Sequence, residues 1–326
     1  MIVVTGGAGF IGSALIWALN NQGRNDILVV DRLGTTEQWR NLVGLRFADY
    51  MDKATFIEDL EAGRFGSTLE AILHMGACSS TTEADADYLM ANNYGYTARI
   101  AVWRASRPAC RLIYASSAAT YGDGAHGYTD DEDRLDALRP LNMYGFSKHC
   151  FDLRARREGW LKDIVGLKYF NVFGPNEDHK GAMRSVVNKA YPGVRDTGRM
   201  TLFKSHRTDY AHGEQRRDFI YVKDAAAMTL FFLDHPDING LFNVGTGRAR
   251  SWNDVARSLF AATGQTGAID YIDMPYELRT KYQYHTRADT AKLEAAGAPG
   301  AAFTLEAAVA DYVANYLAAS SRLTPE

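Results

Sequence analysis

The sequence begins with an apolar run, Ile2–Val4, that leads directly into Thr5-Gly6-Gly7-Ala8-Gly9-Phe10-Ile11-Gly12. Three of these glycines, Gly6, Gly9 and Gly12, have the spacing G-x-x-G-x-x-G, and an amphipathic helical pattern follows. Glycine is required where a turn takes positive φ, where the backbone approaches a pyrophosphate and where a helix packs closely against a strand. The N-terminus of a helix also presents free N–H groups and a positive dipole. The segment therefore predicts a strand, a tight turn and a helix that bind the pyrophosphate of a dinucleotide.

A second apolar run, Ile27–Val30, ends at an acidic residue, Asp31, about 20 residues after the glycine turn. A carboxylate at this position accepts hydrogen bonds from ribose hydroxyls and repels a 2′-phosphate, which favours NAD. The adjacent Arg32 carries a guanidinium that would pair with such a phosphate, which favours NADP. We therefore expect NADP, with NAD as the alternative.

Short apolar runs alternate with amphipathic segments through the first half of the chain. Each intervening segment has about ten residues or more, a length that suits a right-handed crossover between parallel strands. This alternation predicts an α/β fold with a Rossmann-type, doubly wound parallel sheet. Its expected strands are Ile2–Val4, Ile27–Val30, Ala71–His74, Leu112–Ala115 and Val165–Tyr169.

The length of 326 residues fits two lobes that share a cleft. After Asn171 the pattern becomes irregular, until apolar runs return at Asp218–Val222 and Leu241–Val244. We expect an NAD(P)-binding domain made of residues 1–170 and 218–247. Residues 171–217 and 248–326 would form a smaller, mostly C-terminal α/β substrate lobe with a strand at Ala268–Tyr271.

Composition and charge restrict the class of protein. The chain is 46% hydrophobic and 23% charged with a formal net charge of −3, so no broad basic field for nucleic acid is expected. The three cysteines suit reduced thiols in the cytoplasm, and no His/Cys cluster has the spacing of metal ligands. Met1–Thr5 already has the pattern of a buried strand, which argues against a signal peptide. The most apolar helical run, Ala225–Leu233, is about half of the ~20 residues that a membrane span needs.

Tyr144 and Lys148 are four positions apart, so they would share one face of a helix. A tyrosine with an ordinary pKa near ~10 acts as a base at neutral pH only if a cation stabilises its phenolate, and Lys148 could be that cation. Ser117 follows the apolar run Leu112–Ala115 and would emerge at the carboxyl edge of the sheet, where open α/β folds bind their ligands. The three residues together predict proton transfer to and from a substrate oxygen.

These features resemble the extended short-chain dehydrogenases/reductases, which include sugar-nucleotide epimerases and dehydratases. The resemblance is carried by Thr5–Gly12, Ser116-Ser117, Tyr144 with Lys148, and Tyr169–Pro175. Other segments are similar to those of the ADP-glycero-manno-heptose 6-epimerases, namely Asp49–Lys53, Gly76–Glu83, Asn92–Tyr94, His179–Met183 and Tyr282-Gln283. This likeness implies epimerisation at C6″ of ADP-D-glycero-D-manno-heptose to its L-glycero-D-manno epimer, in the supply of heptose for the lipopolysaccharide core.

The resemblance also implies a set of site residues. Tyr144 and Lys180 would be the two acid/base groups, assisted by Lys148 and Ser117. One tightly held NADP per subunit would contact Gly6, Gly9, Phe10, Ile11, Gly12, Asp31, Arg32, Lys53, Met75, Gly76, Ala77, Cys78, Ser79, Asn92, Lys148, Val172 and Lys180. The substrate would contact Ser79, Ser117, Asn171, Ala182, Lys189, Phe203, Lys204, Ser205, His206, Arg217 and Tyr282. A homo-oligomer is expected, with a pentamer as one form.

Two features depart from the family pattern. Gln38 stands where the family often has a lysine that would pair with the 2′-phosphate of NADP. The segment Ser205–Gln215 is also longer than the corresponding segment in the family.

Alternative readings stay open at this point. Another nucleotide-sugar epimerase or reductase, for example a 4-epimerase, would have the same fold. A 4,6-dehydratase is disfavoured because Ala118-Ala119 stand where such enzymes have an Asp-Glu pair. A non-catalytic NADP-sensing protein would usually lack the Tyr144 and Lys148 pair. Lys180 could also be an ordinary surface ammonium, and Arg217 could form a salt bridge instead of binding a diphosphate.

Overall fold

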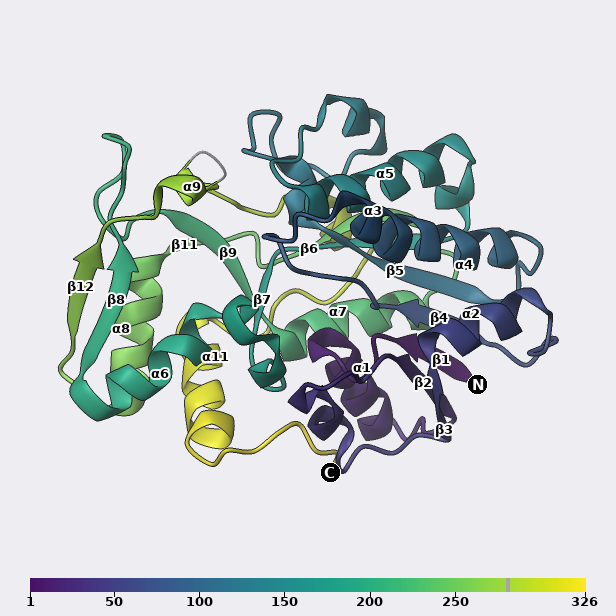
Figure 1. Ribbon diagram of the computed structural model, residues 1–326, viewed down its shortest axis with the longest axis horizontal. Helices are drawn as coiled ribbons and strands as arrows, with labels where there is room; N and C mark the ends of the chain where they lie inside the picture. Colours follow the sequence, from purple (N-terminus) through teal and green to yellow (C-terminus); the bar gives the residue numbers. More distant parts are fainter. Residues whose placement is uncertain (280–281) are drawn as a thin grey trace.

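The computed structural model describes residues 1–279 and 282–326. Its centre is a seven-stranded parallel sheet with strand order β10-β6-β5-β4-β1-β2-β3 (Figure 1). The order changes direction at β1 and β4, as in a doubly wound sheet, which confirms the predicted fold class. The strands are β1 (Ile2–Thr5), β2 (Ile27–Asp31), β3 (Asp49–Asp52), β4 (Ala71–His74), β5 (Arg111–Ser117), β6 (Val165–Tyr169) and β10 (Gly240–Val244).

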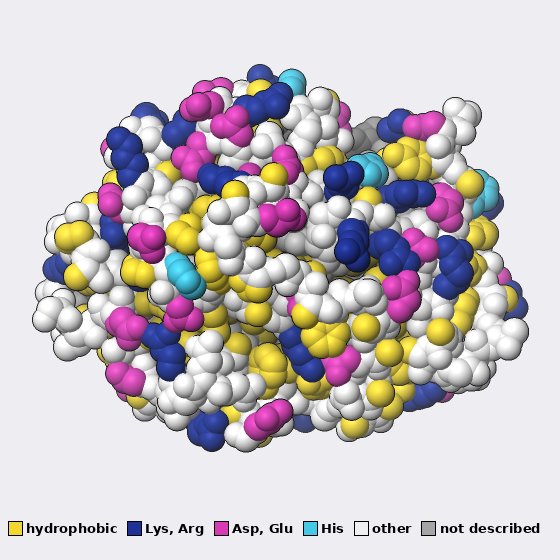
Figure 2. All heavy atoms as spheres, turned by 180° about the vertical axis from the view of Figure 1, so that it is seen from behind, with side chains coloured by type: hydrophobic (Ala, Val, Ile, Leu, Met, Phe, Trp, Pro, Cys, Tyr) yellow, Lys and Arg dark blue, Asp and Glu magenta, His cyan; other side chains and the backbone are white. Residues whose placement is uncertain are grey.

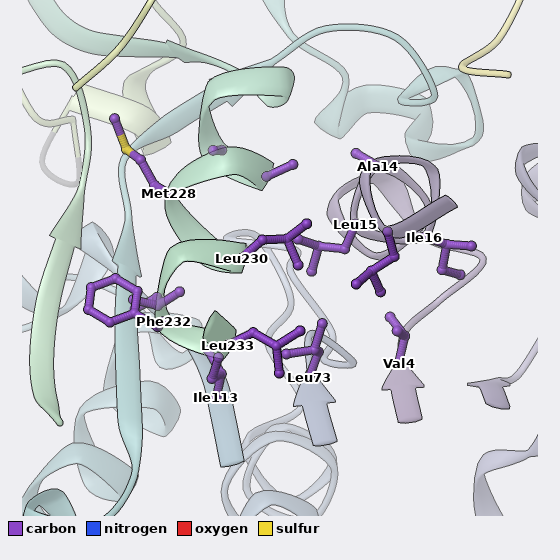
Figure 3. Packing of buried hydrophobic residues seen from close by; sticks show 14 of the residues in the cluster. Val4, Ala14, Leu15, Ile16, Leu73, Ile113, Met228, Leu230, Phe232 and Leu233 are labelled. Atoms are coloured by element: carbon purple, nitrogen blue, oxygen red, sulfur yellow. The ribbon is translucent and has the colours of Figure 1, made fainter. Parts of the chain in front are cut away.

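Helices cover both faces of this sheet. One face packs against α1 (Phe10–Asn21) and α7 (Val222–Asp234), and the other against α2 (Lys53–Glu61), α4 (Tyr96–Ala105) and α5 (Met143–Arg157) (Figure 1). Neighbouring strand residues alternate between the two cores: Val4 belongs to the first and Val3 to the second. Figure 3 shows Leu15 of α1 and Leu230 of α7 close to the strand residues of the first core. Burying a leucine side chain contributes about 1.5–3 kcal/mol, so these layers hold the strand ends in place.

Two further small sheets lie outside the main sheet, in the part of the molecule that we call the smaller lobe. β11 (Ala249–Ser251), β9 (Arg216–Tyr221) and β7 (Asn171–Phe173) form one, and β12 (Ala268–Ile272) pairs with β8 (Arg199–Phe203) in the other. A third core joins them to α6 (Val186–Thr197), α8 (Trp252–Thr263) and α11 (Leu305–Tyr312). Because β9 pairs with β7 and β11 while β10 joins the main sheet, residues 218–247 contribute to both parts. The division into two lobes stays a prediction.

The remaining elements are short helical turns. They are η1 (Glu37–Leu42), α3 (Ala86–Leu89), η2 (Met90–Gly95), η3 (Ala118–Tyr121), η4 (Glu132–Ala137), η5 (Trp160–Lys162), η6 (Asp178–Met183), α9 (Tyr276–Arg279), α10 (Ala291–Ala295) and η7 (Val313–Leu317).

Several strands were not expected from the sequence. β8 alternates exposed and buried residues, and β3 lies at the edge of the main sheet with both ends exposed, so neither contains a continuous apolar run. The irregular stretch after Asn171 in fact contains β7, α6 and β8. The expected strands of the main sheet are confirmed within one or two residues at each end.

The surface carries interspersed charges of both signs. On the face opposite to Figure 1, Lys and Arg side chains gather over the smaller lobe with Asp and Glu among them (Figure 2). Several cations of the smaller lobe are paired, as in Arg199–Asp270 and Arg250–Glu306. Within residues 1–279 and 282–326, no helix is long and apolar enough to cross a membrane.

Candidate active site

The glycine turn between β1 and α1 has the geometry of a phosphate cradle. Gly6 has a φ of +66°, and a Cβ on Gly12 would lie 2.1 Å from the carbonyl oxygen of Gly6. Helix α1 begins after Gly9, and in the described part of the chain no side chain caps its N-terminus. Its first turn also contains no acidic residue, so the N–H groups and the helix dipole are available to an anion.

A cavity of about 170 Å³ opens beside this turn. It brings together eight of the residues predicted to bind the cofactor: Gly6, Asp31, Arg32, Lys53, Gly76, Ala77, Cys78 and Asn92. Gln38 also lines it, together with Thr5, Val30, Tyr88 and Tyr96, which sequence reasoning did not single out. The two tyrosines come from α3 and α4, and no local pattern marks them as ligand contacts.

Asp31 is held at the end of β2 by backbone donors. Its Oδ2 accepts a 2.9 Å hydrogen bond from the Ala8 N–H, and its Oδ1 accepts one of 2.7 Å from the Arg32 N–H. Burial raises the pKa of Asp31, and the hydrogen bonds from Arg32, Ala8 and Gln38 oppose that rise. The carboxylate is thus tied to the glycine turn, where a ribose would lie.

Two cations share the same cavity. Burial lowers the pKa of Lys53, and the positive charge of Arg32 lowers it further, so the two side chains lie close enough to repel. Lys53 donates a hydrogen bond to Asn92 Oδ1. The amide of Gln38 donates to the Arg32 carbonyl oxygen at 3.2 Å. An anionic group placed here would relieve the repulsion between the cations.

Asn93 fixes the loop that follows β4. Its Oδ1 accepts a hydrogen bond from the Cys78 N–H at 2.8 Å, and its Nδ2 donates to the Cys78 carbonyl oxygen at 3.0 Å. The same Nδ2 lies 3.1 Å from Ser147 Oγ on α5. Asn93 is buried in the π-helical turn η2, a kind of turn that is frequent at functional sites. It was missed as a site residue because its partners lie far away in the sequence.

Tyr144 and Lys148 lie on the first two turns of α5. Asn142 caps this helix by accepting a 2.8 Å hydrogen bond from the Gly145 N–H. A Cβ on Gly145 would lie 2.6 Å from the Ala119 carbonyl oxygen, so α5 packs closely against the turn that follows Ser117. Burial raises the pKa of Tyr144, and a hydrogen bond with Ser117 opposes that rise. The sequence-predicted Ser117 and Tyr144 therefore lie near each other.

Lys148 points toward the end of β5. Its Nζ donates a 2.7 Å hydrogen bond to the Ala115 carbonyl oxygen. Burial lowers its pKa to about 8, although the nearby Asp152 carboxylate opposes the effect. Lys148 is thus mainly cationic at neutral pH and becomes neutral on the alkaline side.

A fully buried polar network lies beneath these residues. Asp152, one turn after Lys148, accepts hydrogen bonds from Ser116 Oγ at 2.7 Å and Tyr114 OH at 2.9 Å, and its Oδ2 lies 2.9 Å from Lys168 Nζ. Both charged side chains are 0% exposed. The network joins α5 to β5 and β6, so it fixes the helix that carries Tyr144 relative to the strand that carries Ser117.

Lys180 lies in η6 and packs against the start of α1. Its Nζ is 5.1 Å from the centre of the Phe10 ring. Burial lowers the pKa of Lys180, and the negative charge of Glu177 opposes that shift. A half-buried side chain beside the glycine turn is not the solvated surface ammonium that was considered as an alternative.

A second cavity, of about 440 Å³, opens in the smaller lobe. It brings together the predicted substrate residues Lys189, Phe203 and Tyr282 with Trp252, which was not predicted. The buried Arg217 guanidinium lies 5.0 Å from the ring centre of Tyr282 and 5.9 Å from that of Trp252. Among the side chains that the structure describes, no acid forms an ion pair with Arg217, which disfavours the salt-bridge reading.

The other predicted substrate residues line neither cavity. Lys204 pairs with Asp273 at 3.4 Å, and the His206 N–H donates to Tyr284 OH at 2.9 Å. Lys189 Nζ donates to the Ala182 carbonyl oxygen at 3.2 Å. The predicted substrate residues that line neither cavity are Ser79, Ser117, Asn171, Ala182, Lys204, Ser205, His206 and Arg217. All the predicted substrate and cofactor contacts stay predictions, whether or not they line a cavity. Likewise Met75, whose Sδ accepts a 3.5 Å hydrogen bond from Tyr169, and Val172 in β7 stay predictions as cofactor contacts.

A model of the NAD dependent epimerase/dehydratase family matches residues 2–245. The chain belongs to this family. Over 320 residues it is 52% identical to the ADP-L-glycero-D-manno-heptose-6-epimerase of Nitratidesulfovibrio vulgaris (strain Hildenborough), and the alignment covers 98% of this chain and 99% of that protein. These matches confirm the family resemblance found in the sequence.

Two solved structures place this epimerase/dehydratase family member among known folds. The crystal structure of Helicobacter pylori ADP-L-glycero-D-manno-heptose-6-epimerase has a TM-score of 0.79 and 28% identity, covering 96% of this chain and 95% of that chain. A UDP-N-acetylglucosamine 4-epimerase from Methanobrevibacter ruminantium M1 has a TM-score of 0.82 at 23% identity, covering 98% of both chains. The second likeness shows the fold alone.

Among residues 1–279 and 282–326, no group of three or more His, Cys, Asp or Glu side chains could hold a metal ion. The candidate reacting groups predicted from the sequence are phenol, hydroxyl and ammonium groups. All of these lie around the carboxyl ends of β1, β5 and β7.

Proposed function

We propose that this family member is an epimerase that inverts C6″ of ADP-D-glycero-D-manno-heptose by transient oxidation and reduction. The observation that carries the proposal is that Lys148, one helical turn after Tyr144 on α5, donates its Nζ hydrogen bond at the end of β5, the strand whose last residue is Ser117. The substrate assignment is supported by 52% identity over nearly the full length to a relative named for that reaction.

A nicotinamide dinucleotide fits the residues around the glycine turn. The uncapped N-terminus of α1 suits its pyrophosphate, and Asp31 suits the adenosine ribose. Such a cofactor, when bound, supplies the hydride acceptor and donor that the reaction needs. Arg32 and Lys53 in the adjoining cavity favour NADP over NAD, because a 2′-phosphate would pair with both cations.

Tyr144 is the acid/base group for one orientation of the substrate. Its phenol has a raised pKa and is neutral by default, so it can donate a proton to a carbonyl oxygen. To accept a proton from an alcohol it needs a stabilised phenolate, and the Lys148 cation on the same helix face provides the stabilising charge. Ser117 holds the reacting oxygen through its hydroxyl group.

Lys180 is the acid/base group for the opposite orientation. Inversion requires that the hydride leave one face of C6″ and return to the other, so the oxygen exchanges its proton in two different orientations. Two acid/base groups therefore suit the reaction better than one. The lowered pKa of Lys180 makes its ammonium a better proton donor than that of an exposed lysine. Its contact with Phe10 places it beside the cofactor turn.

The cavity in the smaller lobe suits the nucleotide part of the substrate. Phe203 and Trp252 offer aromatic faces for stacking a nucleobase, and Lys189 lines the same space. The buried Arg217 has the guanidinium geometry that binds a diphosphate in a bidentate manner. These residues orient the nucleotide so that the heptose extends toward Tyr144.

A homo-oligomeric assembly belongs to the same proposal. Val102 of α4 and Phe146 of α5 are 52% and 46% exposed, and in the proposed assembly a partner subunit would cover such apolar side chains. Light scattering coupled to size exclusion would give the subunit number. A monomer at micromolar concentration would contradict this part of the proposal.

The experiment that tests the activity is an incubation of the purified protein with ADP-D-glycero-D-manno-heptose, without added cofactor, followed by NMR of the C6″ epimers. The wild type should interconvert the epimers, while Tyr144→Phe and Lys180→Met should be strongly impaired. No conversion, with or without added NADP or NAD, would exclude the heptose substrate. Conversion of a different nucleotide sugar at C4 would favour a 4-epimerase.

A further inference from the structure

The last residues of the sequence pack against helix α1, which follows the glycine turn. Figure 1 shows the C-terminus beside α1, far from the preceding helix α11. Leu323 is 0% exposed and belongs to the core that contains Phe10 and Ala14. The Thr324 carbonyl oxygen accepts a 3.1 Å hydrogen bond from the Trp17 indole N–H. Residues 322–326, which we call the tail, are therefore packed and bonded to the protein.

The tail is linked through Asn176 to residues 176–183, which we call the Lys180 segment. The Leu323 N–H donates a 3.1 Å hydrogen bond to Asn176 Oδ1, and Asn176 Nδ2 donates to Ser13 Oγ of α1 at 3.0 Å. Asn176 is buried and has a φ of +75°, a conformation that a non-glycine residue keeps only when its surroundings hold it. It directly precedes Glu177, whose carbonyl oxygen accepts from the Lys180 N–H at 3.0 Å.

A second link runs through Asn41. The Arg322 Nε donates to Asn41 Oδ1 at 3.2 Å, and because a guanidinium cannot accept, this contact fixes which end of the amide is oxygen. The opposite end, Nδ2, then lies 3.0 Å from the Ala8 carbonyl oxygen and 2.9 Å from that of Asn176. It is also 3.2 Å from Nδ1 of His179, the residue before Lys180. Arg322 lies 3.8 Å from Asp178 as well.

These contacts meet at the side-chain amide of Asn41. The glycine turn is held at Ala8, and the Lys180 segment is held at Asn176 and His179, by an asparagine whose amide the tail orients. From the other side, the buried Glu177 ties the same segment to the body of the smaller lobe, since it accepts from Ser185 Oγ at 2.6 Å and Tyr312 OH at 3.2 Å.

We infer that the tail, acting through Asn41 and Asn176, positions Lys180 against the start of α1 for proton transfer. The inference rests on the proposed role of Lys180 in epimerisation. It assigns to Arg322 and Leu323 a positioning role, since neither lines the cavities that would take cofactor or nucleotide. A displacement of a reacting group by about 1 Å can reduce a rate by about 100-fold, so a modest loosening of the segment should be measurable.

The test is a double-mutant cycle between the tail and Lys180. Four proteins are compared with NADP in excess: wild type, a deletion of residues 322–326, Lys180→Met, and the combination. The deletion should lower kcat by about 10- to 100-fold in the wild-type background. In the Lys180→Met background it should change kcat by no more than about twofold, because the group that it positions is already absent. A deletion of residues 325–326 is the matched control and should leave kcat unchanged, since it removes only the contact of Glu326 with Asn21.

The outcomes separate the inference from the activity on which it rests. An equal loss in both backgrounds, or no loss in the wild-type background, would overturn the positioning role. If wild type itself does not epimerise the heptose, the proposed function fails, and hydrogen–deuterium exchange decides the inference alone. Exchange in residues 176–183 should then increase in the deletion and stay unchanged in the control; unchanged exchange in both would overturn it. If the deletion does not fold, Arg322→Met, which removes only the contacts with Asn41 and Asp178, takes its place in both measurements.

Discussion

Lys148 Nζ donates a 2.7 Å hydrogen bond to the carbonyl oxygen of Ala115, two residues before Ser117. The helix that carries Tyr144 is thereby bonded to the strand that carries the serine. Asp152, one turn further along the same helix, binds Ser116 on that strand. The positions of the phenol and the hydroxyl therefore depend on a few buried polar contacts.

The pH dependence of the reaction should reveal the Lys148 charge. Burial lowers the pKa of Lys148 to about 8 from 10.5, so the cation is lost as the pH rises through about 8 and kcat should fall there. In Lys148→Arg the fall should move to higher pH, because a guanidinium titrates above about 12, even if the maximum rate is lower. A fall of kcat at the same pH in both proteins would contradict this assignment.

Replacement of Tyr144 should abolish proton transfer without loss of the cofactor site. We expect Tyr144→Phe to lower kcat by about 10²- to 10⁴-fold, the usual contribution of a general acid/base. Bound cofactor, measured by absorbance after release, should be unchanged. Arg157→Ala, an exposed side chain at the end of the same helix, is the control and should retain wild-type kcat. A kcat in Tyr144→Phe within threefold of wild type would reject the role.

Cofactor preference should follow the two cations of the first cavity. Arg32→Ala and Lys53→Ala should each weaken NADP binding by about 10- to 100-fold, because a charged hydrogen bond contributes about 1.5–3 kcal/mol, and should affect NAD much less. Gln38→Lys should have the opposite effect and strengthen NADP binding. Calorimetry on the cofactor-stripped protein measures both affinities. Equal losses for NADP and NAD would show that the cavity does not bind a 2′-phosphate.

The buried pair of Lys168 and Asp152 should matter for stability. Lys168→Met leaves Asp152 charged, buried and without its ion-pair partner, which should lower the free energy of unfolding by about 3–5 kcal/mol. Adding Asp152→Asn should restore part of the loss, because the unpaired charge is removed. The amide oxygen can still accept from Tyr114 OH, and the amide nitrogen can donate to Ser116 Oγ. Urea denaturation gives these values. A double mutant less stable than Lys168→Met would contradict the explanation.

Local sequence patterns predicted the parts of the site that lie on one element. The glycine turn, Asp31 at the end of β2, and Tyr144 with Lys148 on α5 are each recognisable from spacing alone. Partly exposed strands such as β8 were missed because they contain no continuous apolar run.

Contacts between distant segments could not be read from the sequence. Asn93 holds Cys78, Lys168 pairs with Asp152, and Trp252 joins Tyr282 at the second cavity. None of these pairs has a local signature, because the fold brings together residues from separate elements. The tail contacts are of the same kind, since Arg322 and Asn41 are 281 positions apart in the sequence.

In the proposed reaction, C6″ is oxidised and then reduced again within one site. The most direct measurement uses ADP-D-glycero-D-manno-heptose deuterated at C6″, incubated in ordinary water without added cofactor and followed by NMR. Retention of the deuterium at C6″ in both epimers is expected, because a hydride that leaves and returns does not exchange with solvent. Replacement of the deuterium by solvent hydrogen as the epimer forms would show that the carbon is inverted by deprotonation, and would contradict the proposed chemistry.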